Sequence, residues 1–435
     1  MSMPDGRQPA AAPPALTFKI VHVDRSKRSP IYRFDVTTTL PNFKRKRYLA
    51  VERSYLELEK LRQHLVQTYP ECLIPVLPAA TAHTPTSLAS SNNATLVPLD
   101  GQGPTKTFNT TSYEEDALVR EAIQIFLHRI VSQPILRNDY ELREFVETPF
   151  AFNPATIPSG YLPVHSSFLS FGSSRRSRTN FQSQVDPSRR LMDCTPGSDE
   201  WYSVFGAQMV SFEEHLAPMR KSAARIARKR KVLAELLQDF AAKNVALSVT
   251  EPSEELSLTL RKTGNWLHRV SDIQRIQAEH GSMRFDYFLD QYTRSTETVL
   301  DAIVSRQQIY SEYDATAKRA ERKKQNIMVL KSSSSIHSDR ADQALDDFEQ
   351  AKNDQSSKRQ LIERVNNILP KDLDSFEAHR ELDFMHWLKV VAKRQLEFEK
   401  QQFVEWDRLR QQLSHSPTAA ERLRPRAPRQ PAVTR

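Results

Sequence analysis

The chain has 435 residues, of which 62 are Lys or Arg and 53 are Asp or Glu, giving a formal net charge of +9. This length predicts two or more domains. With Gly counted in place of Tyr, the 39% apolar fraction becomes about 38%, below the roughly 45–50% of compact globular chains. The composition argues against an enzyme with a large core and fits long amphipathic helices, each of which buries one stripe, joined to unstructured tails.

The two ends and the cysteines indicate where the protein works. Residues 1–15 contain no apolar stretch of the roughly 7–15 residues that a secretion signal needs, and runs of about 18 apolar residues occur nowhere. We expect a disordered N-terminus, no cleaved signal and no membrane-spanning helix. Cys72 and Cys194 lack CxxC or zinc-site spacing, which predicts a reducing compartment and no metal. The Arg-rich and Pro-rich segment 414–435 predicts a disordered basic tail.

Residues 16–150 mix strand and helix signals. Runs rich in β-branched and aromatic residues predict a three-stranded meander over 16–23, 31–40 and 46–55. Leu58, Leu61 and Leu65 then predict a helix that Pro70 ends, followed by an extended Pro-rich turn. The Ser/Thr/Asn-rich stretch 79–112 predicts a flexible loop. Two amphipathic helices are expected over 113–131 and 139–147, and a linker over 151–198.

After residue 199, Gly and Pro become rare, and apolar residues recur at steps of three and four over many turns. The pattern predicts three long helices, at 199–248, about 253–330 and about 339–413. Pro218 marks a kink in the first helix or its true start, and Pro370 is expected to interrupt the third. Trp266, Trp387 and Trp406 lie on the apolar seams, as anchors of a core or of a dimer interface.

The order of elements in residues 16–150 resembles a PX domain, a phosphoinositide-binding module. Three segments carry the resemblance: VERSYLELEKL (51–61), IPVLPAA (74–80) and VREAIQIFL (119–127). The resemblance implies an α+β fold and a pocket whose Arg side chains bind a 3-phosphate through charge-assisted hydrogen bonds.

The residues that would bind the phosphate are mostly replaced. Where the family pattern has cations, this chain has Ser54, Ala80 and Val119. Arg53, Tyr55 and Arg120, which is roughly 100° around the helix from Val119, leave a route to residual binding. The resemblance therefore implies a PX fold with a degenerate lipid pocket.

The C-terminal half resembles a BAR domain, an all-α dimer of three-helix coiled coils that senses or bends membrane. The segments 228–251, 285–324 and 379–409 look like the end of the first helix and like the second and third helices of a sorting-nexin BAR domain, here over 199–413. Linked PX and BAR domains define the SNX-BAR sorting nexins. The degenerate pocket, the long loop and the linker resemble an atypical fungal branch of that family, found in the retromer coat.

Two groups of cations are candidates for membrane contact. The turn between the second and third long helices carries Lys318, Arg319, Arg322, Lys323 and Lys324 against Glu321, and Lys331 follows. On the first long helix, Lys221, Arg225 and Arg228 share one stripe at steps of four and three residues. The alternative is that both groups are ordinary solvated faces of long helices.

The resemblance implies a non-catalytic coat subunit that binds and tubulates endosomal membrane for retromer-dependent endosome-to-Golgi sorting. It implies a cytoplasmic protein, peripheral on endosomes, that pairs with a second SNX-BAR protein, joins the retromer cargo-sorting complex and needs no cofactor. A homodimeric curvature sensor acting through phosphatidylinositol 3-phosphate alone is one alternative. A basic coiled coil that binds nucleic acid is another, although no RRM signature, zinc finger or heptad-linked basic region is present. Motifs of common enzyme classes, such as GxxxxGK[ST], HExxH and GxSxG, are also absent from the sequence.

Overall fold

The computed structural model describes residues 15–25, 29–80, 110–154, 191, 194–332 and 338–414. The predicted disordered N-terminus and basic tail, and most of the predicted loop 79–112 and linker 151–198, lie outside the described residues. The chain divides into two compact units. The first unit comprises Met1–Met219 and Tyr287–Arg380, and the second comprises Arg220–Asp286 and Glu381–Arg435.

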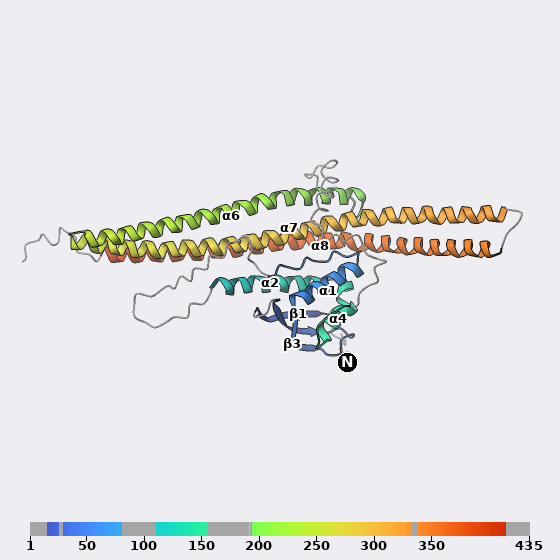
Figure 1. Cartoon of the computed structure of the whole chain (residues 1–435), viewed down its shortest axis with the longest axis horizontal. Helices are drawn as coiled ribbons and strands as arrows, with labels where there is room; N and C mark the ends of the chain where they lie inside the picture. Colours follow the sequence, from blue (N-terminus) through green and yellow to red (C-terminus); the bar gives the residue numbers. More distant parts are fainter. Residues whose placement is uncertain are drawn as a thin grey trace, which may run out of the picture. The chain divides into compact units, whose positions relative to one another are not determined.

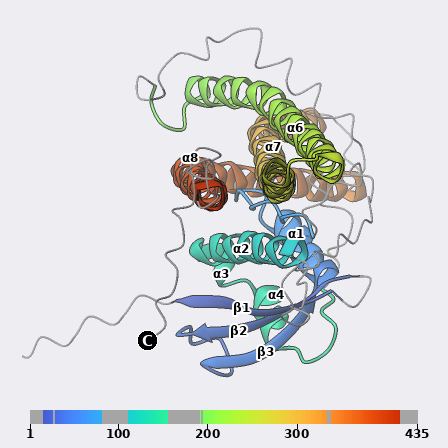
Figure 2. The same cartoon turned by 90° about the vertical axis from the view of Figure 1, so that its left-hand side faces the viewer.

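The N-terminal part of the first unit is built on the predicted meander. Strands β1 (Leu16–Asp24), β2 (Ile31–Thr38) and β3 (Arg47–Ser54) form an antiparallel sheet in the order β1-β2-β3, which confirms that prediction. Alternate residues of β2, among them Tyr32, Phe34 and Val36, are buried on one face. That face packs against helices, as Figure 2 shows.

Four helices complete this α+β domain: α1 (Tyr55–Thr68), α2 (Thr110–Ser132), α3 (Pro134–Arg137) and α4 (Tyr140–Glu147). The three predicted Leu of α1 are fully buried, and Phe145 of α4 packs on Phe34 with ring centroids 6.5 Å apart. Helix α2 begins at Thr110, slightly inside the stretch predicted as a loop.

Both outer strands of the sheet have local features that affect their edges. On β1, the side-chain amide of Gln124 from α2 accepts from Ile20 N at 2.9 Å and donates to Phe18 O, as a neighbouring strand would. On β3, Ala50 has φ 55°, and its N–H donates to Asp35 Oδ1 at 3.1 Å where the pairing register shifts. Such a bulge bends a strand and disfavours pairing with a further strand.

The three predicted long helices are present as α6 (Asp199–Thr250), α7 (Glu254–Ser332) and α8 (Ser338–Ser414). Pro252 lies between α6 and α7. Pro218 lies inside α6, so the helix starts at Asp199. The predicted interruption at Pro370 is wrong, because α8 continues through it. The buried side chains of Val365, Leu369 and Leu373 hold both sides of this proline in one core, which offsets the missing backbone hydrogen bond.

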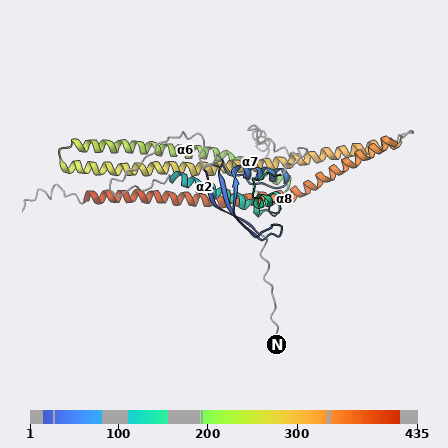
Figure 3. The same cartoon turned by 60° about the horizontal axis from the view of Figure 1, so that its bottom comes forward.

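That core lies in the first unit and joins the beginning of α6 to the middle of α7 and α8. Its members include Trp201 and Phe205 of α6, Val299 and Ile303 of α7 and the leucines around Pro370, and Leu73 of the Pro-rich turn packs against it. Asp199, where α6 begins, pairs with Arg306 at 2.8 Å. Beyond Arg306, among the described residues, α7 continues beside α8 as a pair of helices (Figures 1 and 3).

The second unit has a smaller core of Ala241, Trp266, Leu267, Val270 and Leu409. Helices α6 and α7 approach closely at Gly264, where an added Cβ would lie 2.6 Å from Val245 Cγ2 and 3.0 Å from Ala241 O. The ring centroids of Trp266 and Trp406 are 4.1 Å apart, which agrees with their predicted role as apolar anchors.

Candidate functional site

The junction of β3 and α1 is where the PX pattern predicts a phosphate-binding cation. Ser54 occupies this position as the N-cap of α1 and forms a capping box with Glu57. The Ser54 hydroxyl accepts from Glu57 N at 3.3 Å, while Ser54 N donates to Glu57 Oε2 at 2.7 Å. Burial would raise the pKa of the Glu57 carboxyl, but hydrogen bonds from Phe152 N and Ser54 lower it, so it is ionised at neutral pH. A phosphate here would meet a carboxylate.

Arg53 is turned into the domain. It is 3% exposed, and its guanidinium donates to Phe145 O and Glu52 O, each at 2.8 Å, and to Thr148 O. It also lies over the Phe145 ring, 5.4 Å from the centroid. These contacts tie β3 to the end of α4. The predicted residual lipid contact of Arg53 stays a prediction, and it would compete with this network.

The other positions of the expected pocket also lack an available charge. Val119 is fully buried inside α2, so a guanidinium at this position would point into the apolar core. Ala80 is half-buried at the end of the described Pro-rich turn, and Arg120 is half-buried on α2. The structure therefore brings Ser54, Tyr55 and the Pro-rich turn together, while the three positions at which the PX pattern has cations carry uncharged side chains.

Helix α7 covers this end of the domain. Tyr287 is 6% exposed, and the pKa of its hydroxyl is raised by burial and by the neighbouring hydroxyls of Tyr32 and Tyr55. The hydroxyl of Tyr55, one of the three residues expected to allow residual lipid binding, donates to Pro78 O at 2.9 Å. The hydroxyl of Tyr55 is thus bound inside the first unit, and the predicted lipid contact of this residue stays a prediction.

Residues 75–79 of the Pro-rich turn are neither helix nor strand, so their carbonyl oxygens need other partners. Side chains of α1 and α7 donate to all five in succession. The pairs are Arg62 Nε to Pro75 O (3.0 Å), Gln291 Nε2 to Val76 O (3.2 Å), Arg294 Nη1 to Leu77 O (3.3 Å), Tyr55 to Pro78 O and Tyr287 to Ala79 O (3.1 Å). Sequence analysis missed the α7 donors, which no local pattern marks.

Helix α8 binds the beginning of the same turn. Asp372 accepts from Leu73 N at 2.9 Å and from Gln133 Nε2 at 2.6 Å, and Arg364 pairs with Glu71 at 3.2 Å. Burial raises the pKa of Asp372 to about 6, although both hydrogen bonds oppose this shift. The Pro-rich turn is therefore held on both long helices.

The predicted basic groups lie mostly at the surface. On α7, Lys318, Arg319, Arg322 and Lys324 are exposed, whereas Lys323 pairs with Asp347 of α8 at 2.5 Å. On α6, the three cations Lys221, Arg225 and Arg228 are exposed on one stripe. Of these five α7 cations, one is therefore in an ion pair between helices and four face solvent.

The second unit exposes two apolar stripes. On α6, Ile226, Leu233, Phe240 and Leu247 follow one another at intervals of seven residues, and all are exposed. On α8, exposed apolar side chains cover about a third of the helix circumference: Leu382, Met385, Leu388, Leu396, Phe403 and Trp406. Apolar repeats of this kind are typical of helices that pack on a further helix.

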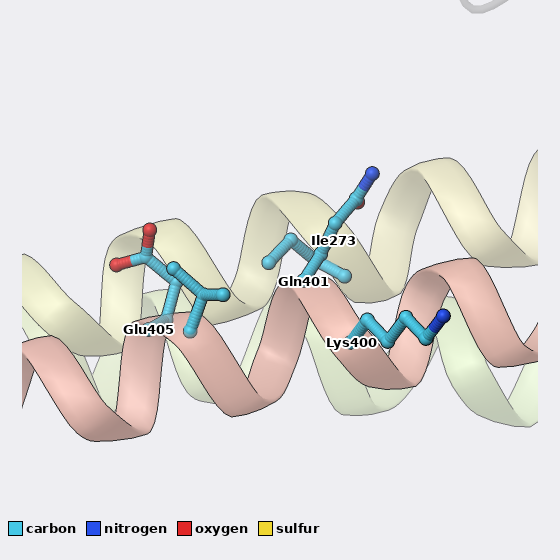
Figure 4. Close-up of a pocket in the computed structure, with 5 residues that line it drawn as sticks. Ile273, Lys400, Gln401 and Glu405 are labelled. Atoms are coloured by element: carbon cyan, nitrogen blue, oxygen red, sulfur yellow. The ribbon is translucent and has the colours of Figure 1, made fainter.

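A hollow of about 390 Å³ lies beside the α8 stripe (Figure 4). It is lined by Ile273 of α7 and by Lys400, Gln401, Val404 and Glu405 of α8. The Glu405 carboxylate is paired with Arg269 and Arg408, each at 2.5 Å. With Ile273 and Val404 as its apolar lining, the hollow has the character of a packing surface.

Neither a metal site nor a membrane span emerges from the described residues. No group of three or more His, Cys, Asp or Glu side chains is placed there to hold a metal ion. None of the described helices is long and apolar enough to cross a bilayer.

Comparison with known families identifies both parts of the chain. A family model described as Vps5 C terminal like matches residues 179–412, more than half of the chain. The chain belongs to the Vps5 C-terminal-like family. A PX domain model matches residues 41–149, so this member carries a PX domain before its BAR-type helices. The predicted resemblance to PX–BAR sorting nexins is confirmed.

Several curated proteins are similar to this chain, and each alignment covers only part of the relative. Vacuolar protein sorting-associated protein 17 of Schizosaccharomyces pombe is 24% identical over 267 residues, covering 61% of this chain and 41% of the relative. The protein of the same name from Saccharomyces cerevisiae is 22% identical over 385 residues, covering 88% and 61%. Sorting nexin-1 of Mus musculus is 21% identical, covering 86% and 67%. The chain thus spans less than two thirds of the length of the two yeast relatives.

Among solved structures, the cryo-EM structure of the SNX-BAR Mvp1 tetramer is similar. It has 16% sequence identity and a TM-score of 0.48, and the match covers 90% of this chain and 99% of that one.

Replacing Arg53 by Lys should lower the local free energy of unfolding of the PX domain by about 2 kcal/mol, because one ammonium cannot reach three carbonyl oxygens. Amide hydrogen exchange of β2 and β3 should then become roughly 30-fold faster. The matched control is Arg33→Lys, at an exposed Arg that pairs with Glu52 at 2.5 Å on the same sheet. Equal exchange in both variants would contradict the structural role of Arg53.

Replacing Arg294 by Gln should loosen the Pro-rich turn by about 1 kcal/mol, because Leu77 O loses its charged donor. Exchange of the Val76, Leu77 and Ala79 amides should accelerate roughly fivefold. Arg275→Gln is the control, since Arg275 pairs with Asp272 at 3.1 Å on the same helix, as Arg294 does with Asp290, and both Arg side chains are 33% exposed. Unchanged exchange in the Arg294 variant would show that the turn does not depend on α7.

Proposed function

We propose that this sorting nexin is a non-catalytic coat subunit that binds and bends endosomal membrane through the charge of its long helices. Its PX domain gives it little or no specificity for a lipid headgroup. The observation that supports this most directly is the contrast between two regions: four exposed cations on α7, and an expected PX pocket with Ser54, Ala80 and Val119 in place of cations.

The weak pocket follows from what its residues already do. Ser54 is used as a helix cap beside an ionised carboxylate, Arg53 is bound to three carbonyl oxygens, and Tyr55 is bound to Pro78. A bidentate guanidinium contact is the usual basis of phosphate specificity. Forming one here would require breaking contacts that hold the first unit together.

The membrane affinity then comes from the helices. A Lys or Arg near an anionic surface contributes about 1 kcal/mol at physiological ionic strength, and the contribution fades within a Debye length of about 8 Å. Lys318, Arg319, Arg322 and Lys324 on α7, joined by the α6 stripe of Lys221, Arg225 and Arg228, are enough for salt-sensitive binding to anionic vesicles.

Pairing with a second SNX-BAR chain supplies what this chain lacks. The exposed α6 and α8 stripes of the second unit fit the interface of a helical dimer. A partner with an intact phosphoinositide pocket would add one specific lipid contact per dimer to the charge of both chains. The similarity to vacuolar protein sorting-associated protein 17 supports a place in endosome-to-Golgi sorting with the retromer cargo-sorting complex.

Replacing Lys318, Arg322 and Lys324 together by Gln removes three cations from the surface. At physiological salt, this variant should bind roughly tenfold more weakly, or weaker still, to vesicles that contain about 30% phosphatidylserine. Vesicle flotation measures this. Adding a few per cent of phosphatidylinositol 3-phosphate at constant vesicle charge should leave the binding of the unmodified chain unchanged.

The matched control removes three exposed cations of α8, Lys352, Arg359 and Lys371, in the same way and with the same change in net charge. Equal losses in the two triple variants would mean that only net charge matters. Tight binding that depends on the 3-phosphate would contradict the proposed loss of lipid specificity.

Replacing Phe240 by Glu should abolish self-association of the purified chain, which we expect to be weak, with a dissociation constant in the micromolar range or above. A charge at this position would be buried in the dimer seam. Light scattering against concentration measures the mass. Val249→Glu is the control, because Val249 is 78% exposed but lies about 180° from Phe240 around α6. A homodimer stable at nanomolar concentration would contradict the need for a different partner chain.

A further inference from the structure

The end of α7 carries two exposed apolar residues that the charge-based function does not use. Met328 is 58% exposed and Val329 is 65% exposed, in the last turns before α7 ends at Ser332. Moving side chains of this size from water into an apolar phase is favourable, so two adjacent exposed ones are suited to contact with such a phase.

The cations of α7 lie on the same faces as these apolar residues. At 100° per residue, Lys318, Arg322 and Val329 lie within about 40° of one another around the helix. Met328 follows Lys324 by four residues and therefore lies above it on a neighbouring face. Val329 is about 10 Å beyond Arg322 along the axis. Each apolar side chain thus has a cation one or two turns before it.

The helix paired with this part of α7 has the opposite charge. Lys323 faces α8 through its 2.5 Å pair with Asp347, and the buried Ala320 and Ala351 lie in the two paired helices. The exposed charged side chains of α8 over 342–354 are four acids, Asp342, Asp346, Glu349 and Asp354, and one cation, Lys352. An anionic surface is therefore attracted to the α7 side of the pair and repelled from the α8 side.

We propose that the end of α7 inserts Met328 and Val329 into the headgroup region of an anionic bilayer, while Lys318, Arg322 and Lys324 bind the lipid phosphates around them. The long cationic side chains can extend toward the phosphates while the apolar pair lies deeper. The inserted pair adds a salt-resistant component to electrostatic binding, and it displaces lipid in one leaflet, which favours curvature. This inference rests on the membrane binding proposed above and names the residues that enter the bilayer.

The test replaces Met328 and Val329 together by Gln, which preserves helix propensity. On vesicles with about 30% phosphatidylserine, the M328Q/V329Q variant should bind about tenfold more weakly at physiological salt. The binding that survives at high salt should disappear. Leu49→Gln is the control for loss of an exposed apolar side chain, since Leu49 is exposed on β3, away from α7.

A probe at the same position gives an independent readout. An environment-sensitive fluorophore on Met328→Cys should shift to shorter wavelength on vesicles and be quenched by brominated lipid chains. The same label on Ser356→Cys, exposed on the acidic side of α8, should remain aqueous. The chain's own Cys72 and Cys194 are buried, so that the introduced thiol is labelled selectively.

The outcomes separate this inference from the proposed function. Normal binding of M328Q/V329Q at every salt concentration, with an aqueous probe at position 328, overturns the insertion even if the Lys318/Arg322/Lys324 variant has lost binding. A loss of protein assembly in solution, without vesicles, would make the apolar pair a protein contact and would also overturn it. Loss of binding only in the charge variant supports the proposed function alone.

Discussion

Five consecutive carbonyl oxygens in an extended segment constrain the first unit. Backbone oxygens that are removed from water must find donors, and residues 75–79 have none in a helix or strand. Two donors come from α1 of the same PX domain and three from α7, more than 200 residues later in the chain. The PX fold and the central part of the long helices therefore depend on each other, because the segment that shapes the expected lipid pocket is also the segment that α7 holds.

The same constraint explains which parts of the site could be predicted. The strands, α1 and the long helices follow from periodicity and turn residues, and the missing cations at Ser54, Ala80 and Val119 could be identified from the PX pattern. The roles that these three positions have in the folded chain could not be predicted in this way. Whether Ser54 caps a helix or Val119 lies in a core depends on neighbours that are distant in sequence. Gln291 and Arg294 look like ordinary surface residues of a helix until the fold brings the carbonyl oxygens to them.

At Pro370, the local sequence pattern led to a wrong prediction. Local preference says that a proline ends or breaks a helix, and in a solvated helix it usually does. Here Leu369 and Leu373 are buried with Trp201 and Phe205 of α6, so packing fixes the backbone on both sides.

The roles of the charged residues of α7 also depend on contacts between helices. The alternation of Lys, Arg and Glu along α7 resembles any solvated helix, and only the pairing of Lys323 with Asp347 shows which cations face α8 and which face outward.

The seven-residue spacing of Ile226, Leu233, Phe240 and Leu247 determines the handedness of any coil that α6 forms. A straight α-helix has 3.6 residues per turn, so a seven-residue repeat drifts by about 20° at each step, or about 60° from the first of these residues to the last. A rigid rod would therefore lose contact with a partner helix at one end. To keep all four side chains in the interface, the two helices must wind around each other in a left-handed supercoil. The twist of such a helix pair would then originate in the spacing of four apolar residues.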